Sequence, residues 1–350
     1  MSDQTTVRPF RAEVPEEDLV ELRRRIAATR WPSKELVADR SQGVQLATLQ
    51  ELARYWTTDY DWRTCEARLN ALPQFTTQID GVDIHFIHVK SPHENALPLI
   101  MTHGWPGSVI ELLETVGPLT DPTAHGADAE DAFHLVLPSL PGYGFSGEST
   151  EVGWDPGRTA RAWAELMGVA PAMADDPPGS ALVAIRTFQS SGIGYFTEQA
   201  TRPQTIGYAL LDSPAALAAW MLDHDTDAYY KIARAFVDGQ PSGNLTRDNI
   251  LDNITLYWLT GTGASAARSY WEAYGPDAGA ATAPALPPVS LPVGFTTFPG
   301  EIWRTPRSWV ENSYPNLTYF NEVDKGGHFA AWEEPELFAR EVREAFRSLR

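Results

Sequence analysis

The chain has 350 residues, more than one ordinary core requires, so we expect one large domain with an insertion, or two domains. Its formal net charge of −19 argues against nucleic acid and anionic membranes as partners, because clustered Lys and Arg bind both. The single cysteine, Cys65, excludes an internal disulfide and a thiolate metal cluster.

A hydrophobic content of 43% and a charged content of 21% are typical of a globular enzyme. The first ten residues, MSDQTTVRPF, are polar and do not resemble a secretory signal. The sequence also lacks a run of about 18 apolar residues, the length that a membrane-spanning helix needs. We therefore expect a cytoplasmic protein, whose oligomeric state stays open, with a homo-oligomer among the options.

The first part of the chain is predicted to hold two helices and a β-hairpin. Apolar residues at helical spacing predict helices over 16–30 and 45–56. Residues 76–89 then alternate between apolar and polar around Asp80-Gly81, a two-residue turn that is typical of a hairpin.

From Leu97 onward, apolar strands alternate with helices, which is typical of a parallel sheet wrapped by helices. A strand, a helix, a second strand and a second helix are predicted at 96–103, 109–119, 132–140 and 157–167. The Pro-rich stretch 171–180 is turn-like and cannot form a central strand.

The remaining chain is predicted to be a helical insertion followed by a return to the sheet. After the helical residues 188–275 come an Ala/Pro/Gly-rich linker, two strands and a last helix, at 275–288, 293–298, 317–323 and 334–349. We therefore predict an N-terminal extension, an α/β core in two pieces, and a helical lid with its linker. Their bounds are 1–95, 96–187 with 288–350, and 188–287.

The sequence HGWPG at 103–107 directly follows a predicted buried strand. A Gly-containing loop after a strand can aim backbone N–H groups at one point, as an oxyanion hole requires. The backbone N–H of Trp105 is the candidate donor. An ordinary turn is the simpler interpretation of this motif taken alone.

Two further motifs carry a candidate general base and its partner. His328 lies in GGHFAAWE, on a Gly-rich loop after a strand and before the last helix, where α/β-hydrolases keep their base. Glu301 lies in FPGE after the strand at 293–298, where a carboxylate can orient an imidazole. Taken alone, each residue is as easily a capping, core or surface side chain.

Several motifs together resemble the epoxide hydrolases of the microsomal type and their bacterial relatives. The motifs are HGWPGS, LPSLPGYGFSG, QATRPQTIGYALLDSP, YWLTGT and GGHFAAWEEPELF, in that order along the chain. The N-terminal sequence VRPFRAEVPEEDLVELRRRIAATRWP is similar to the wrapping extension of that family. The resemblance runs from Val7 to Arg350.

The resemblance implies an α/β-hydrolase fold with a helical lid, and an apolar or aromatic small-molecule epoxide as substrate. In the family, an Asp attacks the epoxide, and a water activated by His then hydrolyses the resulting ester. Matched by motif, His328 is the base, Glu301 orients it, and Trp105 is an oxyanion donor. Tyr195 and Tyr270 match the two lid tyrosines that bind the epoxide oxygen. No metal or organic cofactor is implied.

The family's nucleophile motif, Gly-Gly-Asp-Trp-Gly, is missing from this chain. It should follow the helix that ends at Met167, but the interval 168–187 is shorter than the roughly 30 residues that a strand, an elbow and a helix require. We predict that the central strand and the nucleophile elbow are deleted. The neighbouring strands must then pair anew or leave backbone groups unpaired, at about 1–3 kcal/mol for each buried group.

No other residue is a convincing replacement nucleophile in the sequence. The candidates are Asp175, Asp176, Asp212, Ser190 and Ser191, and none has the setting of a strained elbow; Asp212 is interpreted as a helix N-cap. Three hypotheses follow: an epoxide hydrolase, a pseudoenzyme that binds an apolar small molecule, and direct attack by a His-activated water without a covalent intermediate.

Overall fold

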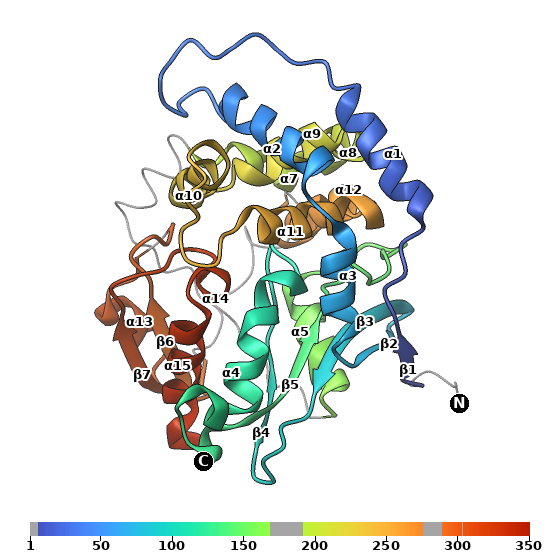
Figure 1. Cartoon of the computed structure of the whole chain (residues 1–350). Helices are drawn as coiled ribbons and strands as arrows, with labels where there is room; N and C mark the ends of the chain where they lie inside the picture. Colours follow the sequence, from blue (N-terminus) through green and yellow to red (C-terminus); the bar gives the residue numbers. More distant parts are fainter. Residues whose placement is uncertain (1–5, 169–191, 276–288, 303) are drawn as a thin grey trace.

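The computed structural model describes residues 6–168, 192–275, 289–302 and 304–350 (Figure 1). A mixed sheet forms the centre of the molecule, with helices covering it and a layer of lid helices above it in this view. The strand order in this sheet is β1-β2-β3-β5-β4. The strands are Arg8–Phe10 (β1), Gln74–Ile79 (β2), Val82–Val89 (β3), Leu97–Ile100 (β4) and Phe133–Pro138 (β5).

The predicted hairpin is confirmed as β2 and β3. Asp80 and Gly81 both have positive φ, 48° and 82°, as a tight two-residue hairpin turn requires. Strand β3 then pairs antiparallel with β5, which pairs parallel with β4. The hairpin therefore extends the sheet that carries the loop after β4.

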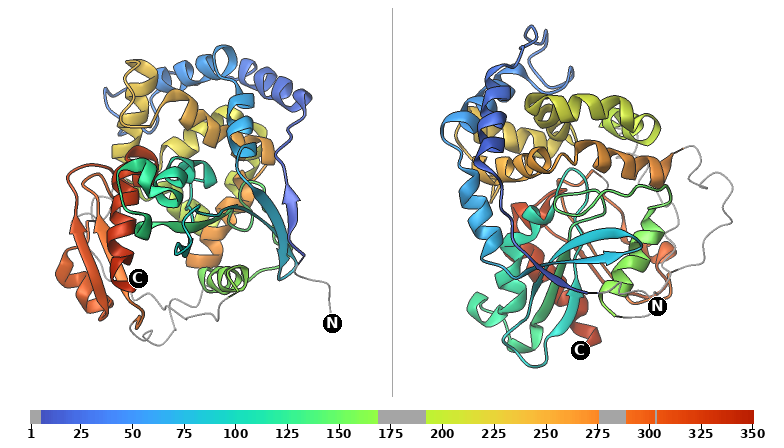
Figure 2. Two further views of the ribbon diagram at one scale, coloured as in Figure 1. Left: turned by 60° about the horizontal axis from the view of Figure 1, so that its bottom comes forward. Right: turned by 90° about the vertical axis from the view of Figure 1, so that its right-hand side faces the viewer.

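A second sheet contains only two parallel strands, β6 (Val293–Thr297) and β7 (Leu317–Glu322). Glu341 of the last helix is buried against both strands, and its Oε2 accepts hydrogen bonds from Thr296, Tyr319 and Asn321. That helix, α15 (Pro335–Phe346), contacts the small sheet and also the helices that follow β4 (Figure 2). Side-chain packing through α15 thus holds the small sheet against the rest of the protein.

The two sheets are not joined by strand pairing within the described residues. Strand β4 ends the five-stranded sheet, and neither β6 nor β7 pairs with it. The interruption lies where the sequence predicts a deleted central strand. Among the described residues, β4 and β6 have not paired anew with each other. The predicted turn at 171–180 and the linker residues 276–288 lie outside the described residues.

The N-terminal extension wraps around the lid. Its helices are Glu16–Ala27 (α1), Leu46–Thr58 (α2) and Trp62–Asn70 (α3), and the sequence analysis missed α3. The lid helices are Gly194–Thr201 (α7), Pro203–Asp212 (α8), Pro214–Leu222 (α9), Thr226–Val237 (α10), Arg247–Thr260 (α11) and Gly263–Tyr274 (α12). Trp56 Nε1 donates to Thr255 Oγ1 at 2.8 Å, which fixes α2 on α11.

Shorter helices complete the covering of the sheets. They are η1 (Val109–Thr115), α4 (Val116–Thr120), η2 (Pro122–His125), η3 (Ala129–Asp131), α5 (Pro156–Leu166), α13 (Arg307–Ser313), α14 (Ala330–Glu333) and η5 (Arg347–Leu349). The helix predicted at 109–119 starts as a 3-10 helix, capped by the Ser108 hydroxyl on the Ile110 N–H. Within the described residues, the model contains no helix with the length and apolarity that crossing a membrane demands.

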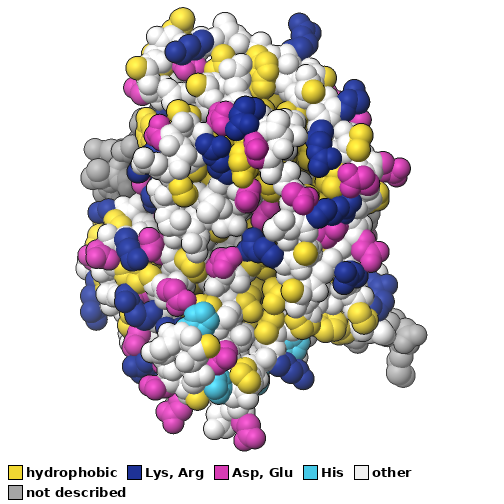
Figure 3. Space-filling view, viewed as in Figure 1, with side chains coloured by type: hydrophobic (Ala, Val, Ile, Leu, Met, Phe, Trp, Pro, Cys, Tyr) yellow, Lys and Arg dark blue, Asp and Glu magenta, His cyan; other side chains and the backbone are white. Residues whose placement is uncertain are grey.

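The surface in Figure 3 carries basic side chains interspersed with acidic ones. Many of these charges form short ion pairs, such as Arg24 with Glu21 at 2.6 Å. On this face, no broad patch of one charge sign stands out.

Candidate active site

A cavity of about 600 Å³ lies between the lid and the core, and it contains all five residues singled out in the sequence. Trp105, Tyr195, Tyr270, Glu301 and His328 all line it. Most of the remaining wall is aromatic or aliphatic, and its large side chains are Leu140, Tyr143, Trp154, Trp163, Phe196 and Tyr274. The cavity is therefore suited to an apolar ligand with a few polar groups at one place.

His328 and Glu301 form a hydrogen-bonded pair at one wall. His328 Nδ1 lies 2.7 Å from Glu301 Oε1. The pair comes from the loops after β7 and β6, and these loops meet because Gly300 and Gly327 form a parallel bridge. A Cβ on Gly300 would lie 2.2 Å from the Asp227 carboxylate, so this close approach requires glycine.

The environment of His328 favours its protonated form. Burial lowers the pKa of His328, but the hydrogen bond to Glu301 and the negative charge of Glu301 outweigh this effect. The charges of Asp225 and Glu111 act in the same direction, so the pKa lies above the ordinary value of 6.5. Because Nδ1–H donates to a carboxylate, Nε2 is the ring atom that is left to accept a proton.

Two tyrosines and a tryptophan face one another across the cavity. The Tyr195 ring, from α7, stacks on Trp105 with centroids 4.9 Å apart. Tyr270, from α12, meets Trp105 edge-on at 5.9 Å and Tyr195 at 6.0 Å. Burial raises the pKa of both tyrosines, so their hydroxyls keep their protons at neutral pH and can donate hydrogen bonds.

The loop that carries Trp105 is held by helix α11. Asn253 Nδ2 donates to Pro106 O at 2.7 Å, and Tyr257 OH donates to Gly107 O at 2.6 Å. The Ser108 hydroxyl donates to Asn253 Oδ1 at 2.7 Å. The backbone N–H of Trp105 makes no hydrogen bond with the residues that the structure describes. It is therefore available as the predicted donor.

His224 also lines the cavity, and the sequence analysis missed it. It lies between α9 and α10, buried against Trp105 and Tyr195, and its ring centroid is 4.4 Å from that of His328. The sequence His224-Asp225 resembles an ordinary helix start, and Asp225 is indeed the N-cap of α10. The only local signal was a histidine beside a carboxylate, which is too common to single out.

Glu301 is the only carboxylate among the described residues that line this cavity. Glu111 lies behind the loop, with its carboxylate against Gly107. Burial raises the pKa of Glu111 to about 8, although the charge of His328 and a hydrogen bond with the Gly104 backbone oppose the shift. Glu111 does not line the cavity and therefore does not replace the missing nucleophile in this arrangement.

The other nucleophile candidates do not reach the cavity in the described structure. Asp212 is the last residue of α8 and pairs with Arg25 at 3.2 Å on the surface. Its interpretation as an N-cap is wrong, since Ser213 caps α9 by accepting from the Ala216 N–H. The remaining candidates, Asp175, Asp176, Ser190 and Ser191, lie outside the described residues.

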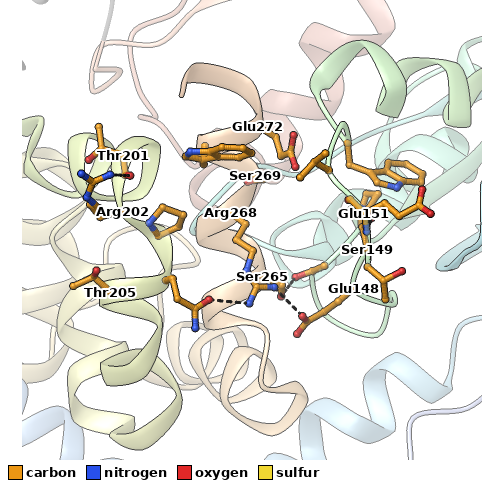
Figure 4. Close-up of a pocket in the computed structure, with 18 residues that line it drawn as sticks. Glu148, Ser149, Glu151, Thr201, Arg202, Thr205, Ser265, Arg268, Ser269 and Glu272 are labelled. Atoms are coloured by element: carbon orange, nitrogen blue, oxygen red, sulfur yellow. Dashed lines mark hydrogen bonds and ion pairs between the residues drawn. The ribbon is translucent and has the colours of Figure 1, made fainter. Parts of the chain in front are cut away.

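A second cavity of about 480 Å³ adjoins the first one, and both are lined by Trp154 and Ser269 (Figure 4). Its wall is more polar, with Arg268 of α12 bonded to Glu148 at 3.1 Å and to Gln204 at 3.3 Å. Glu272 accepts a hydrogen bond from the Gly153 N–H at 2.9 Å. This second cavity contains no histidine, so the proton-accepting groups belong to the first one.

The first cavity thus combines a proton acceptor with hydrogen-bond donors across an apolar space. His328 can take a proton from a water or a hydroxyl, and Glu301 stabilises the imidazolium that forms. Tyr195 and Tyr270 can stabilise a developing oxyanion. In the described part of the chain, no three His, Cys, Asp or Glu side chains cluster as metal ligands would.

Comparisons with known proteins agree with these features. Residues 7–112 match the family model for the epoxide hydrolase N terminus. A putative epoxide hydrolase of Stigmatella aurantiaca is 47% identical, over 98% of this chain and 86% of that protein. Epoxide hydrolase 1 of the pig, Sus scrofa, is 33% identical, over 98% of this chain and 89% of that protein.

Solved structures show the same fold. Juvenile hormone epoxide hydrolase from the silkworm Bombyx mori has a TM-score of 0.84 and 26% identity, covering 99% of this chain and 96% of that one. The Aspergillus niger epoxide hydrolase has a TM-score of 0.79 and 27% identity, covering 99% and 97%. The alignment with the Stigmatella protein spans 390 residues, which exceeds the 350 residues of this chain. That relative therefore contains residues without a counterpart here.

Proposed function

The chain belongs to the epoxide hydrolase family, and we propose that it opens an apolar or aromatic epoxide to a vicinal diol by direct attack of a water that His328 activates. One observation carries this proposal. The hydrogen-bonded pair of His328 and Glu301 faces an aromatic cavity in which Glu301 is the only carboxylate among the described lining residues. The base and its partner are in place, while a nucleophilic carboxylate is not.

The proposed reaction is a single displacement. A water gives a proton to His328 Nε2 as its oxygen bonds to one epoxide carbon. The ring C–O bond breaks, and the released alkoxide takes a proton from Tyr195 or Tyr270. The imidazolium then returns its proton through solvent to the tyrosinate, so that the net change is the addition of one water. Without an ester there is no acyl oxyanion for the Trp105 N–H to bind, and the Trp105 ring serves as cavity wall.

The substrate class follows from the wall of the first cavity. Six large aromatic or aliphatic side chains surround the polar groups, and aromatic rings bind planar apolar groups through stacked or edge-on contacts. An aryl epoxide such as styrene oxide is the appropriate test substrate.

Binding without turnover is the second candidate function, and the interrupted sheet favours it. In the described residues, the element that would carry the family's nucleophile is replaced by a break between β4 and β6. A protein of this kind would bind the same epoxides and release them unchanged.

The test is a single turnover with excess protein in water enriched in ¹⁸O. Direct attack places ¹⁸O in the first diol formed, whereas an ester route delivers an unlabelled oxygen from a protein carboxylate. His328→Ala is the control and should form no diol. Unlabelled diol would overturn direct attack in favour of a covalent route, and saturable epoxide binding without any diol would establish the binding protein instead.

A further inference from the structure

The cavity contains a second histidine–carboxylate pair beside the first one. His224 Nδ1 lies 3.2 Å from Asp225 Oδ2, and both side chains are buried. The His224 ring is tilted by 44° against that of His328, with centroids 4.4 Å apart. Both rings line the same cavity, so the two imidazoles face one small volume.

Asp225 fixes the orientation and tautomer of His224. Its Oδ1 accepts from the Ala228 N–H at 2.8 Å as the N-cap of α10, which holds the carboxylate in place. Its Oδ2 then accepts the Nδ1–H of His224, because a carboxylate has only lone pairs to offer. Nε2 of His224 therefore carries a lone pair, and it makes no hydrogen bond with any residue that the structure describes.

We propose that His224 is a second catalytic imidazole, and that the attacking water donates one hydrogen to His328 Nε2 and the other to His224 Nε2. This inference rests on the function proposed above and names the group that positions its water. Two acceptors fix both hydrogens of the water and leave an oxygen lone pair to attack the epoxide carbon. His328 takes the proton, and His224 accepts a hydrogen bond without any net transfer.

The surroundings of the two rings support this division of roles. Burial lowers the pKa of His224, and the charge of His328 lowers it further, against the opposing effects of Asp225 and Glu301. His224 is thus neutral where His328 is poised to ionise. The other groups that face His224 are the uncharged rings of Trp105, Tyr195 and Phe329. Once His328 is protonated, its charge keeps His224 from taking a second proton.

The experiment compares His224→Phe and His224→Gln with the unaltered protein in steady-state diol formation from styrene oxide. Phe keeps a ring in the cavity but has no acceptor, so we expect kcat to fall about 100-fold while KM changes less than about twofold. Gln offers an amide oxygen as an acceptor, so it should recover part of kcat. His125→Gln, at an exposed histidine paired with Glu336, is the matched control and should keep full activity.

The outcomes separate this inference from the proposed function. If both His224 variants fold, as judged by their thermal transitions, and keep kcat within about twofold, the second imidazole has no catalytic role and the inference is overturned. A rise in KM with unchanged kcat overturns it as well, because His224 would then contribute only to binding. If the unaltered protein forms no more diol than His328→Ala, the proposed function fails and the inference fails with it.

Discussion

The two histidine–carboxylate pairs at this cavity are chemically alike, yet their pKa values move in opposite directions. His328 is bonded to Glu301 at 2.7 Å, and its pKa lies above the ordinary value. His224 is bonded to Asp225 at 3.2 Å, and its pKa lies below that value, mainly because of burial. The shorter bond and the additional carboxylates around His328 decide which imidazole takes the proton.

The difference shows that a residue type and its partner do not define a catalytic role. Two pairs of one chemical kind become a proton acceptor and a hydrogen-bond acceptor when burial and neighbouring charges separate their pKa values. Glu301 and His328 are distant in sequence and are brought together by the bridge of Gly300 and Gly327, whereas His224 and Asp225 are adjacent.

Replacing Glu301 by Gln should give the largest effect on this comparison. The neutral amide cannot stabilise the imidazolium, and its NH₂ group can donate to Nδ1 and so move the ring proton to Nε2. We expect kcat to fall by about 10³–10⁴-fold and the pKa of His328 to drop. Steady-state kinetics and NMR titration of the His328 ring measure the two changes.

The control for this variant is Glu311→Gln, which breaks an exposed pair with Arg307 far from the cavity residues. Retention of more than about a tenth of kcat in Glu301→Gln would contradict the orienting role of Glu301.

The pH dependence of diol formation is the second prediction. Only neutral His328 can accept a proton, so kcat should fall about tenfold per pH unit below the pKa of His328. Because that pKa is raised, the inflection should lie above 6.5 and activity should increase with pH through it. An inflection at or below 6.5 would assign the base to His224 instead.

Replacing Asp225 by Asn should give a smaller effect. Asn is as good an N-cap as Asp, so α10 should keep its start and the melting temperature should change by less than about 2 °C. The amide can donate to His224 Nδ1, which moves the ring proton to Nε2 and removes the acceptor. We expect kcat to fall about tenfold, measured against Asp128→Asn at an exposed position.

Replacing Arg268 by Gln should give the smallest effect. Its pair with Glu148 is partly exposed and contributes at most about 1 kcal/mol to stability. Since Arg268 lines only the second cavity, kcat for styrene oxide should stay within about twofold of the unaltered value. NMR titration should also find both histidine pKa values unchanged, and a shift in either would show that the two cavities act as one electrostatic unit.

Much of the fold could be predicted from local pattern. The hairpin at Asp80-Gly81 follows from alternation and turn chemistry, and strands β4 to β7 follow from short apolar runs. Helix α3 was missed because its nine residues offer few helical repeats, and only its contacts with the rest of the protein favour it. The break between β4 and β6 could be anticipated, since the interval after Met167 is too short for the missing unit.

The candidate site was predicted less completely. Trp105, Glu301 and His328 follow strands and carry motif signals, and the structure brings them to one cavity with Tyr195 and Tyr270. Their catalytic roles remain predictions. His224 could not be found, because its position depends on a ring contact with a residue about a hundred positions further along the chain. Glu111 was hidden in an ordinary amphipathic pattern, and only the fold buries its carboxylate.

The two-stranded sheet has a consequence for how the protein loses activity. A sheet of two strands is marginal by itself, so β6 and β7 depend on α15 and on the buried carboxylate of Glu341. Local opening of this unit, at a lower free energy than global unfolding, would remove Glu301 and His328 together while the five-stranded sheet keeps the Trp105 loop. Inactivation would then be an all-or-none and reversible event that precedes the melting of the main sheet, and enzymatic activity would report on the least stable part of the molecule.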